Sequence, residues 1–311
     1  MPPEVYIFGY QSMLAQGSVA SSIGATVDFV PARLEGYLRE WNAVRDFTIN
    51  PRKRYVHSAD WQPAGRVAFA NLIDQPTGRV NGLCHRVPAD RLDELDFREQ
   101  GYVRLEVTKK MAAYPGFILA PGFPVYAYID PAPANVQVPV SRAYYAMGRD
   151  GARSVEAQVP GFSADYQSST RPAMLADDLV FIFIGADGRH LWLLEETDSS
   201  LVLLLRFAHP QFAGAGDSAP ELARPITPAL DWLDLRTPRN HARPNPRIPP
   251  AMAGELTGHC DAAALSRSPF WLSRLTAIES RCLDLVHLKS LSNDPDPWVR
   301  RTALQHLGVD R

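Results

Sequence analysis

The chain has 311 residues, of which 46% are hydrophobic and 21% are charged, a composition typical of an ordinary globular protein. Its formal net charge of −2 creates no strong field of one sign, so we expect neither a nucleic acid nor an anionic membrane as partner. Because the length exceeds that of one average domain, we expect two or more structural units.

The N-terminus and the cysteines indicate the compartment. The opening residues MPPEVYIFGY lack the basic stretch of a secretory signal, and no uninterrupted apolar run approaches the about 18 residues that a membrane-spanning helix needs. Cys84, Cys260 and Cys282 are far apart and odd in number, which argues against a disulfide framework. We therefore expect a reduced, cytoplasmic protein.

The first half of the chain contains short apolar runs bounded by turn residues. These runs predict strands at residues 4–9, 34–41, 66–73, 79–87, 102–109 and 124–129, with a turn at 75–78. A helix is expected to begin at 88–90, since Pro suits a first helical turn, and to end near Gly101, since Gly favours the position after a helix. Residues 141–158 predict another helix. The resulting class is α+β, a small mixed, partly closed β-barrel with peripheral helices.

The second half divides into three parts. Strands are predicted at 178–185, 190–195 and 201–207, the first two joined by a hairpin turn at Asp187-Gly188. Residues 213–250 are rich in Pro, Ala, Arg and Asn and predict a linker or extended arm. Farther on, Leu272, Leu275, Ile278, Cys282 and Leu285 follow one another at helical spacing and predict one shared helix face. The predicted organisation is a first domain at 1–172, a β-rich extension at 173–212, the arm at 213–260 and a helical tail at 261–311.

Residues 290–307 place an Asp-Pro turn before an amphipathic segment that contains Val-Arg and then Ala-Leu. This arrangement resembles one unit of a HEAT-type helical repeat. No second copy is present, and a lone repeat cannot stack on itself. Two interpretations stay open, a helical hairpin packed on the rest of the chain and a surface that recruits a protein partner.

Two places carry groups suited to chemistry. At the first, the apolar run ends at Gly9 and the turn Tyr10-Gln11-Ser12-Met13-Leu14 follows. A sharp turn after a strand leaves backbone N–H groups free to bind an anion, and the Ser12 hydroxyl adds a donor. By itself this indication is weak, because such turns are common.

At the second place, Asp96 and Glu99 lie three residues apart near the end of the predicted helix, on one face and just before Gly101-Tyr102. A carboxyl group at this position is suited to general acid–base chemistry. The alternative is a solvated acid at a helix end, paired with Arg98 or Lys109.

The two places together resemble the motif pair of the γ-glutamylcyclotransferase superfamily, in its ChaC/AIG2-like branch. Residues 32–37, ARLEGY, and 80–83, VNGL, are similar to the intervening strands of that family, and residues 141–166 to its closing helix. The resemblance covers residues 4–172. One departure stands out, because Gln11 occupies a position where the family has Gly.

Members of this family convert a γ-glutamyl amide into 5-oxoproline and a free amine through attack by the substrate's own α-amine. The resemblance implies Glu99 as the general acid/base and a pocket lined by Tyr102. It also implies that the turn from Tyr10 through Gln11, Ser12 and Met13 to Leu14 binds the glutamyl part of the small-molecule substrate. No metal or cofactor is required, and the leaving amine stays open.

A different class of function is also compatible with the sequence, a catalytically silent domain that binds a γ-glutamyl or amino-acid ligand, with a tail that recruits a protein. Other candidate sites are weaker. His85 follows Cys84 in a predicted strand and is interpreted as a core or edge residue of the sheet instead of a ligand. The charge run at 52–54 is interpreted as a solvated loop, with contact to a substrate carboxylate as the alternative. Residues 293–296 lack the Gly and the distal Glu of a calcium loop.

Overall fold

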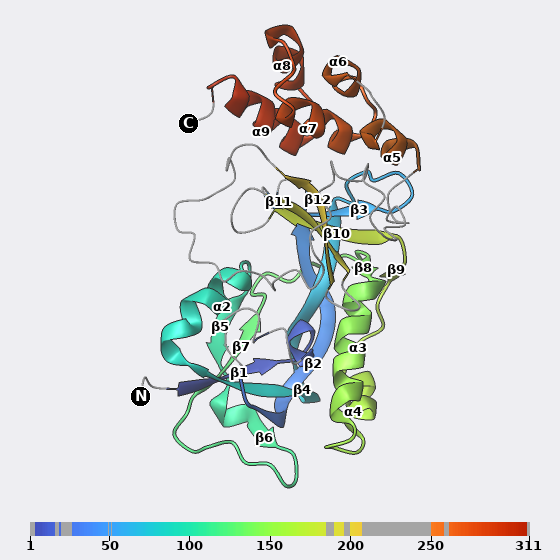
Figure 1. Cartoon of the computed structure of the whole chain (residues 1–311). Coiled ribbons are helices and arrows are strands. Elements are labelled where there is room, and N and C mark those ends of the chain that lie inside the picture. The colour runs from blue at the N-terminus through green and yellow to red at the C-terminus, as the bar shows by residue number, and fades with distance from the viewer. Residues whose placement is uncertain are drawn as a thin grey trace, which may run out of the picture. The chain divides into compact units, whose positions relative to one another are not determined.

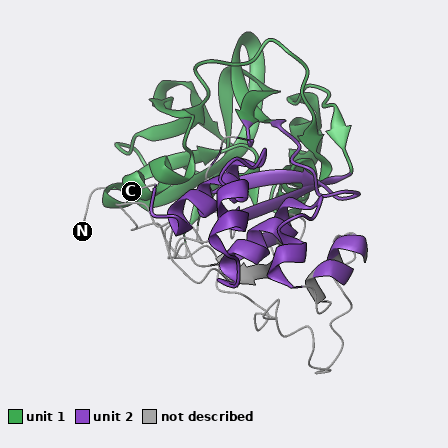
Figure 2. Ribbon diagram, turned by 90° about the horizontal axis from the view of Figure 1, so that it is seen from above, with its two compact units in different colours: residues 1–45, 67–177, 218–224 green, residues 46–66, 178–217, 225–311 purple. Residues whose placement is uncertain are grey.

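The computed structural model describes residues 4–15, 19, 27–48, 50, 52–184, 190–195, 200–206, 250–257 and 261–309. The chain forms two compact units, which Figure 2 colours separately. Unit 1 contains Met1–Arg45 and Val67–Asp177, and unit 2 contains Asp46–Arg66 together with the described residues that follow Asp177. The predicted first domain, 1–172, was continuous. The structure differs at Asp46–Arg66, because the strand in this segment pairs within unit 2.

Unit 1 is built on a six-stranded sheet whose order is β5-β7-β1-β4-β2-β6. In it, β1 is antiparallel to β4 and parallel to β7. The two longest strands bend as they run through the unit (Figure 1). The strands of the sheet are β1 (Glu4–Gly9), β2 (Phe29–Asp46), β4 (Arg66–Pro88), β5 (Val103–Glu106), β6 (Met111–Ala113) and β7 (Val125–Ile129), and a separate parallel pair is formed by β8 (Val140–Ser141) and β9 (Leu175–Ala176).

Strand β4 is continuous, whereas the sequence predicted two strands separated by a turn at 75–78. That prediction was wrong, and Gly78 gives the reason. A Cβ atom at this position would lie 2.3 Å from the backbone oxygen of Tyr37 in β2. Within a strand, Gly often marks the close approach of another backbone instead of a turn.

The helices of unit 1 are short except for α3. They are η1 (Ser12–Leu14), η2 (Ala89–Arg91), α2 (Leu92–Arg98), η3 (Thr108–Lys110), α3 (Arg142–Val155) and α4 (Phe162–Ser168). The helix predicted from 88–90 is present as η2 followed by α2, and the helix predicted at 141–158 is α3, which the Ser141 hydroxyl caps by accepting from the Tyr144 N–H. A curled sheet with peripheral helices confirms the predicted α+β class.

Unit 2 contains a four-stranded antiparallel sheet of order β12-β11-β10-β3 and a group of helices. Its strands are β3 (Lys53–His57), β10 (Leu179–Ile184), β11 (His190–Glu195) and β12 (Ser200–Arg206), so all three strands predicted at 178–207 are present. The predicted turn Asp187-Gly188 and residues 213–249 of the predicted arm lie outside the described residues. The helices are α5 (Pro250–Thr257), α6 (Ala262–Leu265), α7 (Trp271–Glu279), α8 (Leu285–Leu291) and α9 (Pro297–His306). Among the described residues, no helix has both the length and the apolar character needed to cross a membrane.

The helix face predicted from Leu272 to Leu285 does not exist as one surface. Helix α7 ends at Glu279, and α8 begins only at Leu285, where the Asp284 carboxylate accepts from the His287 N–H and caps a new helix. Cys282 lies exposed between the two helices, and Leu285 is 57% exposed. The apolar residues thus keep a helical spacing by coincidence across the break between α7 and α8.

The interpretation of the charge run at 52–54 as a solvated loop is also wrong, because Arg54 is fully buried. It lies on β3, and its guanidinium packs over the rings of Trp271 and Trp298, 4.6 and 4.1 Å from their centroids. Its Nη1 lies 2.7 Å from Oδ2 of Asp296, which also caps α9. The C-terminal helices are thus packed into the core of unit 2, and their likeness to a HEAT repeat stays a prediction.

Candidate active site

The predicted turn after β1 is the short 3-10 helix η1. The Leu14 N–H donates to the Gln11 carbonyl at 2.8 Å, and the Ala15 N–H donates to the Ser12 carbonyl at 3.2 Å. The first N–H groups of such a helix, those of Ser12 and Met13, have no acceptor within it. Met13 and Leu14 themselves are buried and anchor the turn in the core.

Gln11 is held between α3 and α4. Its side chain is 4% exposed, its Nε2 donates to the Tyr144 carbonyl at 2.9 Å, and its Oε1 accepts from the Tyr166 hydroxyl at 2.6 Å. The backbone φ of Gln11 is −143°, so the residue does not lie in the left-handed region that favours glycine. Gly148 of α3 makes room for the side chain, since a Cβ there would lie 2.2 Å from the Gln11 Oε1.

Arg39 of β2 holds the backbone around the turn, a role that the sequence interpretation missed. The side chain is fully buried, its Nε donates to the Tyr10 carbonyl at 2.7 Å, and its Nη2 donates to the Asn81 carbonyl at 2.8 Å. Burial lowers its pKa. In the part of the chain that the structure describes, no carboxylate pairs with Arg39. The sequence did offer one indication of this role, because Arg39 is a positively charged residue inside the predicted strand 34–41.

His85 supports the same turn from β4. It is fully buried, and its Nε2 donates to the Met13 carbonyl at 2.8 Å. Burial lowers the pKa of His85 to about 4, so the imidazole is neutral near pH 7, with the proton on Nε2. Its interpretation as a core residue is confirmed.

Glu99 lies at the end of α2, where its N–H donates to the Leu95 carbonyl. Its side chain is 15% exposed, and its Oε1 lies 2.9 Å from the Nε of Arg98. The same guanidinium reaches the turn, since its Nη2 donates to the Ser12 Oγ at 3.5 Å. Arg98 therefore connects the two places in the sequence that were predicted to carry the chemistry. The alternative of a solvated Glu99 fits the pairing with Arg98 but not the small exposure.

Three buried tyrosines have pKa values that respond to the Glu99 carboxylate. Burial strongly raises the pKa values of Tyr10, Tyr102 and Tyr144, and the nearby negative charge of Glu99 raises each of them further. The hydroxyl of Tyr10 donates to the Tyr128 carbonyl at 2.7 Å, and that of Tyr102 to the Ala70 carbonyl at 2.9 Å. These hydroxyls are neutral near pH 7, so they add polar groups but no further charge to the Glu99–Arg98 pair.

Tyr102 is fixed by Arg45, whose guanidinium lies 4.8 Å from the centroid of its ring. Arg45 also donates to the Gly101 carbonyl at 2.9 Å and pairs with Asp130 at 2.6 Å. Gly101 has a φ of +92°, and a Cβ at that position would lie 2.8 Å from the Nε of Arg45. A glycine is therefore required at this position after α2.

Asp96, the other acid of the predicted pair, does not share the partners of Glu99. Its Oδ1 accepts from the Tyr128 hydroxyl at 2.6 Å and from Arg104 at 3.1 Å, and its side chain is 41% exposed. The structure thus gathers Ser12, Glu99 and the tyrosines, and it directs the Gln11 side chain into the helices.

No protein-family model matches the sequence, and neither does any curated protein. A search of solved structures finds one described as a γ-glutamyl cyclotransferase, at a TM-score of 0.38 and 18% identity, over 53% of this chain and 88% of the other. An uncharacterized human protein matches at a TM-score of 0.40 and 17% identity, over 56% of this chain and 92% of the other. A glutathione-specific γ-glutamyl cyclotransferase from yeast matches at 0.32 and 13%, over 54% of this chain and 98% of the other.

These matches carry no further argument for the resemblance that the sequence motifs predict. With TM-scores below 0.5 and identities of 13–18%, they decide neither the activity nor the substrate of this chain.

Proposed function

We propose that unit 1 is a γ-glutamylcyclotransferase-type enzyme, which releases 5-oxoproline and a free amine from a γ-glutamyl amide. The observation that carries this proposal is the Arg98 bridge. Its guanidinium contacts both Ser12 and Glu99, which come from the two sequence motifs whose pairing resembles that family. An acid/base group is thereby held beside a turn with backbone donors.

Glu99 is the proton acceptor and donor of the reaction. It takes a proton from the α-ammonium of the substrate, and the free amine then attacks the γ-carbonyl carbon within the same molecule. As the new C–N bond closes the five-membered ring, the original amide C–N bond breaks. The attacking nitrogen releases a second proton as the lactam forms, and the leaving nitrogen takes up both protons, the first of them through Glu99, so neither an oxidant nor a second reactant is needed. Holding the substrate folded supplies much of the rate by proximity.

Orientation of the substrate is assigned to the turn. The N–H groups of Ser12 and Met13, together with the Ser12 hydroxyl, offer donors for the glutamyl carboxylate. Support for this role comes from the way the turn is held, by Arg39 on the Tyr10 carbonyl and by His85 on the Met13 carbonyl. Gln11 is compatible with the site because its side chain is already bound to Tyr144 and Tyr166.

The test is release of 5-oxoproline, measured by mass spectrometry with a panel of γ-glutamyl compounds that includes glutathione, γ-glutamyl amino acids and γ-glutamyl amines. We expect release by the wild type and a loss of at least a hundredfold in Glu99→Gln, which keeps the shape but loses the base. The matched control is Glu106→Gln, an exposed acid at the end of β5. Circular dichroism checks that the variants are folded.

Each outcome decides something. Normal turnover by Glu99→Gln would remove Glu99 as the base. If folded wild type releases no 5-oxoproline from any compound, the enzymatic proposal fails and a catalytically silent ligand-binding domain takes its place.

A further inference from the structure

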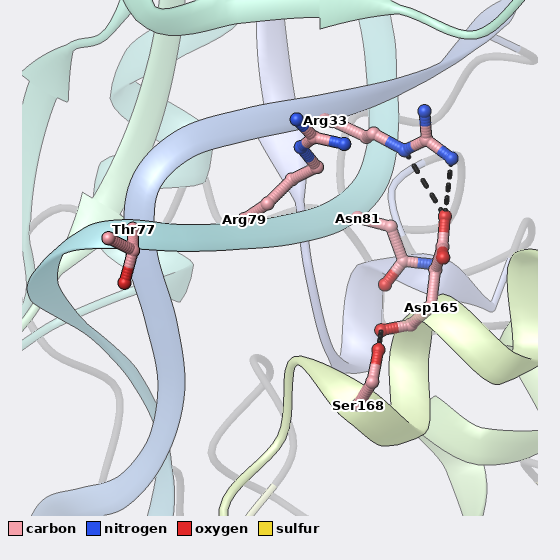
Figure 3. Close-up of a pocket in the computed structure, with 6 residues that line it drawn as sticks. All are labelled: Arg33, Thr77, Arg79, Asn81, Asp165 and Ser168. Carbon is pink, nitrogen blue, oxygen red and sulfur yellow. Dashed lines mark hydrogen bonds and ion pairs between the residues drawn. The ribbon is translucent and has the colours of Figure 1, made fainter.

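A second candidate site lies in unit 1, in a pocket of about 270 Å³ that is lined entirely by polar side chains. Figure 3 shows the pocket between the two long strands and α4. Its size, below that of a drug-binding cleft, suits a small metabolite. The lining residues are Arg33, Thr77, Arg79, Asn81, Asp165 and Ser168, and none of them belongs to the proposed Glu99 site.

The fold brings these side chains together by simple periodicity. Thr77, Arg79 and Asn81 alternate along β4, so they point to the same face of the strand. Asp165 and Ser168 are three residues apart on α4 and share a face of that helix. Arg33 is supplied by β2, the neighbour of β4 in the sheet.

The pocket offers cationic donors that are only partly used. The Nε and Nη2 of Arg33 donate to Asp165 Oδ2 at 3.1 and 2.6 Å, whereas its Nη1 has no partner in the described part of the chain. Arg79 pairs through its Nε with Glu35 at 2.8 Å, and its two Nη groups likewise have no partner among the described residues. A planar guanidinium with free N–H groups is well matched to a carboxylate.

The pocket also offers free acceptors. Asp165 receives the hydrogen bonds from Arg33 and Tyr114 on Oδ2 alone. Although burial acts to raise its pKa, the hydrogen bonds from Tyr114 and Arg33 hold the pKa of Asp165 below its usual value, so it is charged. Its Oδ1 has no donor among the described residues and is available to a ligand N–H.

Asn81 provides a second acceptor. It is 1% exposed, and its Nδ2 donates to the Phe162 carbonyl at 2.8 Å, which fixes the orientation of the amide. Its Oδ1 is then left as a buried oxygen with no donor within the described residues. Such an oxygen costs about 1–3 kcal/mol while unpaired. It has less than 1 Å² of accessible surface, so a ligand N–H pairs with it only after a small shift of the side chain.

We propose that this pocket binds a small zwitterion, a free amino acid or a dipeptide, at a site separate from Glu99. The ammonium group lies at the Asp165 carboxylate, and the carboxylate lies at Arg79 and the free Nη1 of Arg33. The two ends of the ligand thus meet groups of opposite charge, an arrangement that a simple anion cannot satisfy. This binding does not depend on the proposed catalytic function.

The experiment is isothermal titration calorimetry of the full chain with free L-amino acids and glycylglycine, each compared with its N-acetylated and its C-amidated form. We expect the free zwitterion to bind and each blocked form to bind at least tenfold more weakly. Arg79→Gln, which changes a side chain that is 57% exposed and leaves the fold intact, weakens the zwitterion about tenfold. The matched control is Arg86→Gln on the same strand, which removes a guanidinium that pairs with Glu4 outside the pocket.

The proposal is overturned if no zwitterion binds, if blocked and free forms bind equally, or if Arg86→Gln weakens binding as much as Arg79→Gln. Sulfate that binds as tightly as the free amino acid would show a plain anion site and would also overturn it. Glu99→Gln distinguishes the two proposals, because it retains zwitterion binding whether or not 5-oxoproline release is lost.

Discussion

Among the residues that the structure describes, each of the two units buries one arginine completely, and the two units compensate that charge in different ways. Arg39 in unit 1 donates to backbone carbonyls and to the hydroxyl groups of Ser169 and Thr170, and its guanidinium lies 4.2 Å from the centroid of the Tyr166 ring. Arg54 in unit 2 pairs with the carboxylate of Asp296 and lies against two indole rings. Burial lowers the pKa of both.

The different partners of Arg39 and Arg54 indicate two different structural roles for a buried arginine. An arginine that donates to carbonyls on several segments fixes the backbone, and Arg39 fixes it beside the candidate active-site turn. An arginine bound to a carboxylate and packed against aromatic rings joins two elements, and Arg54 joins β3 to the start of α9. A buried ion pair is costly to break because the remaining charge has lost its partner. Loss of a cation that binds only dipoles leaves no such charge.

The largest expected effect is that of Arg54→Met. It leaves Asp296 buried without its partner, so we expect the free energy of unfolding of unit 2 to fall by about 3–5 kcal/mol. Urea denaturation followed by tryptophan fluorescence measures this, because Trp271 and Trp298 contact the guanidinium. Lys53→Met, at an exposed neighbouring position on β3, is the control. An equal loss in both variants would contradict the role of the ion pair.

Arg39→Met is expected to cost less, roughly 2–3 kcal/mol, because it leaves carbonyl oxygens unpaired but no charge. The accompanying effect is local. The Tyr10 carbonyl loses its donor, so amide hydrogen exchange in the turn at Leu14 and Ala15 speeds up more than in the paired strands β5 and β7. A loss as large as that of Arg54→Met, with exchange raised evenly throughout unit 1, would break the distinction between the two arginines.

The smallest effect concerns His85, which supports the same turn as Arg39 through the Met13 carbonyl. Its pKa of about 4 lies below the value of the unfolded chain, so between about pH 6.5 and pH 4 the unfolded chain binds a proton that the folded chain does not. The contribution of His85 to stability is therefore fully present above pH 6.5 and is lost as the pH falls. We expect a loss of about 2 kcal/mol by pH 5.

Denaturation midpoints from pH 5 to pH 7.5, compared between wild type and His85→Gln, measure this slope. The variant keeps a donor side chain but does not titrate, so its stability is expected to vary less over this range. Identical slopes in the two proteins would show that other groups cause the pH dependence.

Much of the fold followed from the sequence because its signals are local. Short apolar runs predicted β1, β5, β7 and the strands β10, β11 and β12 of unit 2, and the Gly after α2 was expected where Gly101 adopts a positive φ. The same local reasoning failed at 75–78 and at 272–285. At the first, Gly78 serves the approach of β2, and at the second, an Asp cap begins a new helix inside an apparently regular pattern.

The sequence by itself determined which residue types were available, and it brought forward Ser12 and Glu99 as a pair through their motifs. Only the tertiary structure decided how they are connected, since Arg98 spans an 86-residue separation to reach Ser12. It also decided that Arg54 is buried, because its carboxylate partner lies 242 residues away. The physical reason is the same in each case. The periodicity of apolar residues shows which face of a single helix or strand is turned to the core and which to solvent. Hydrogen bonds and ion pairs depend instead on which distant elements pack against that helix or strand.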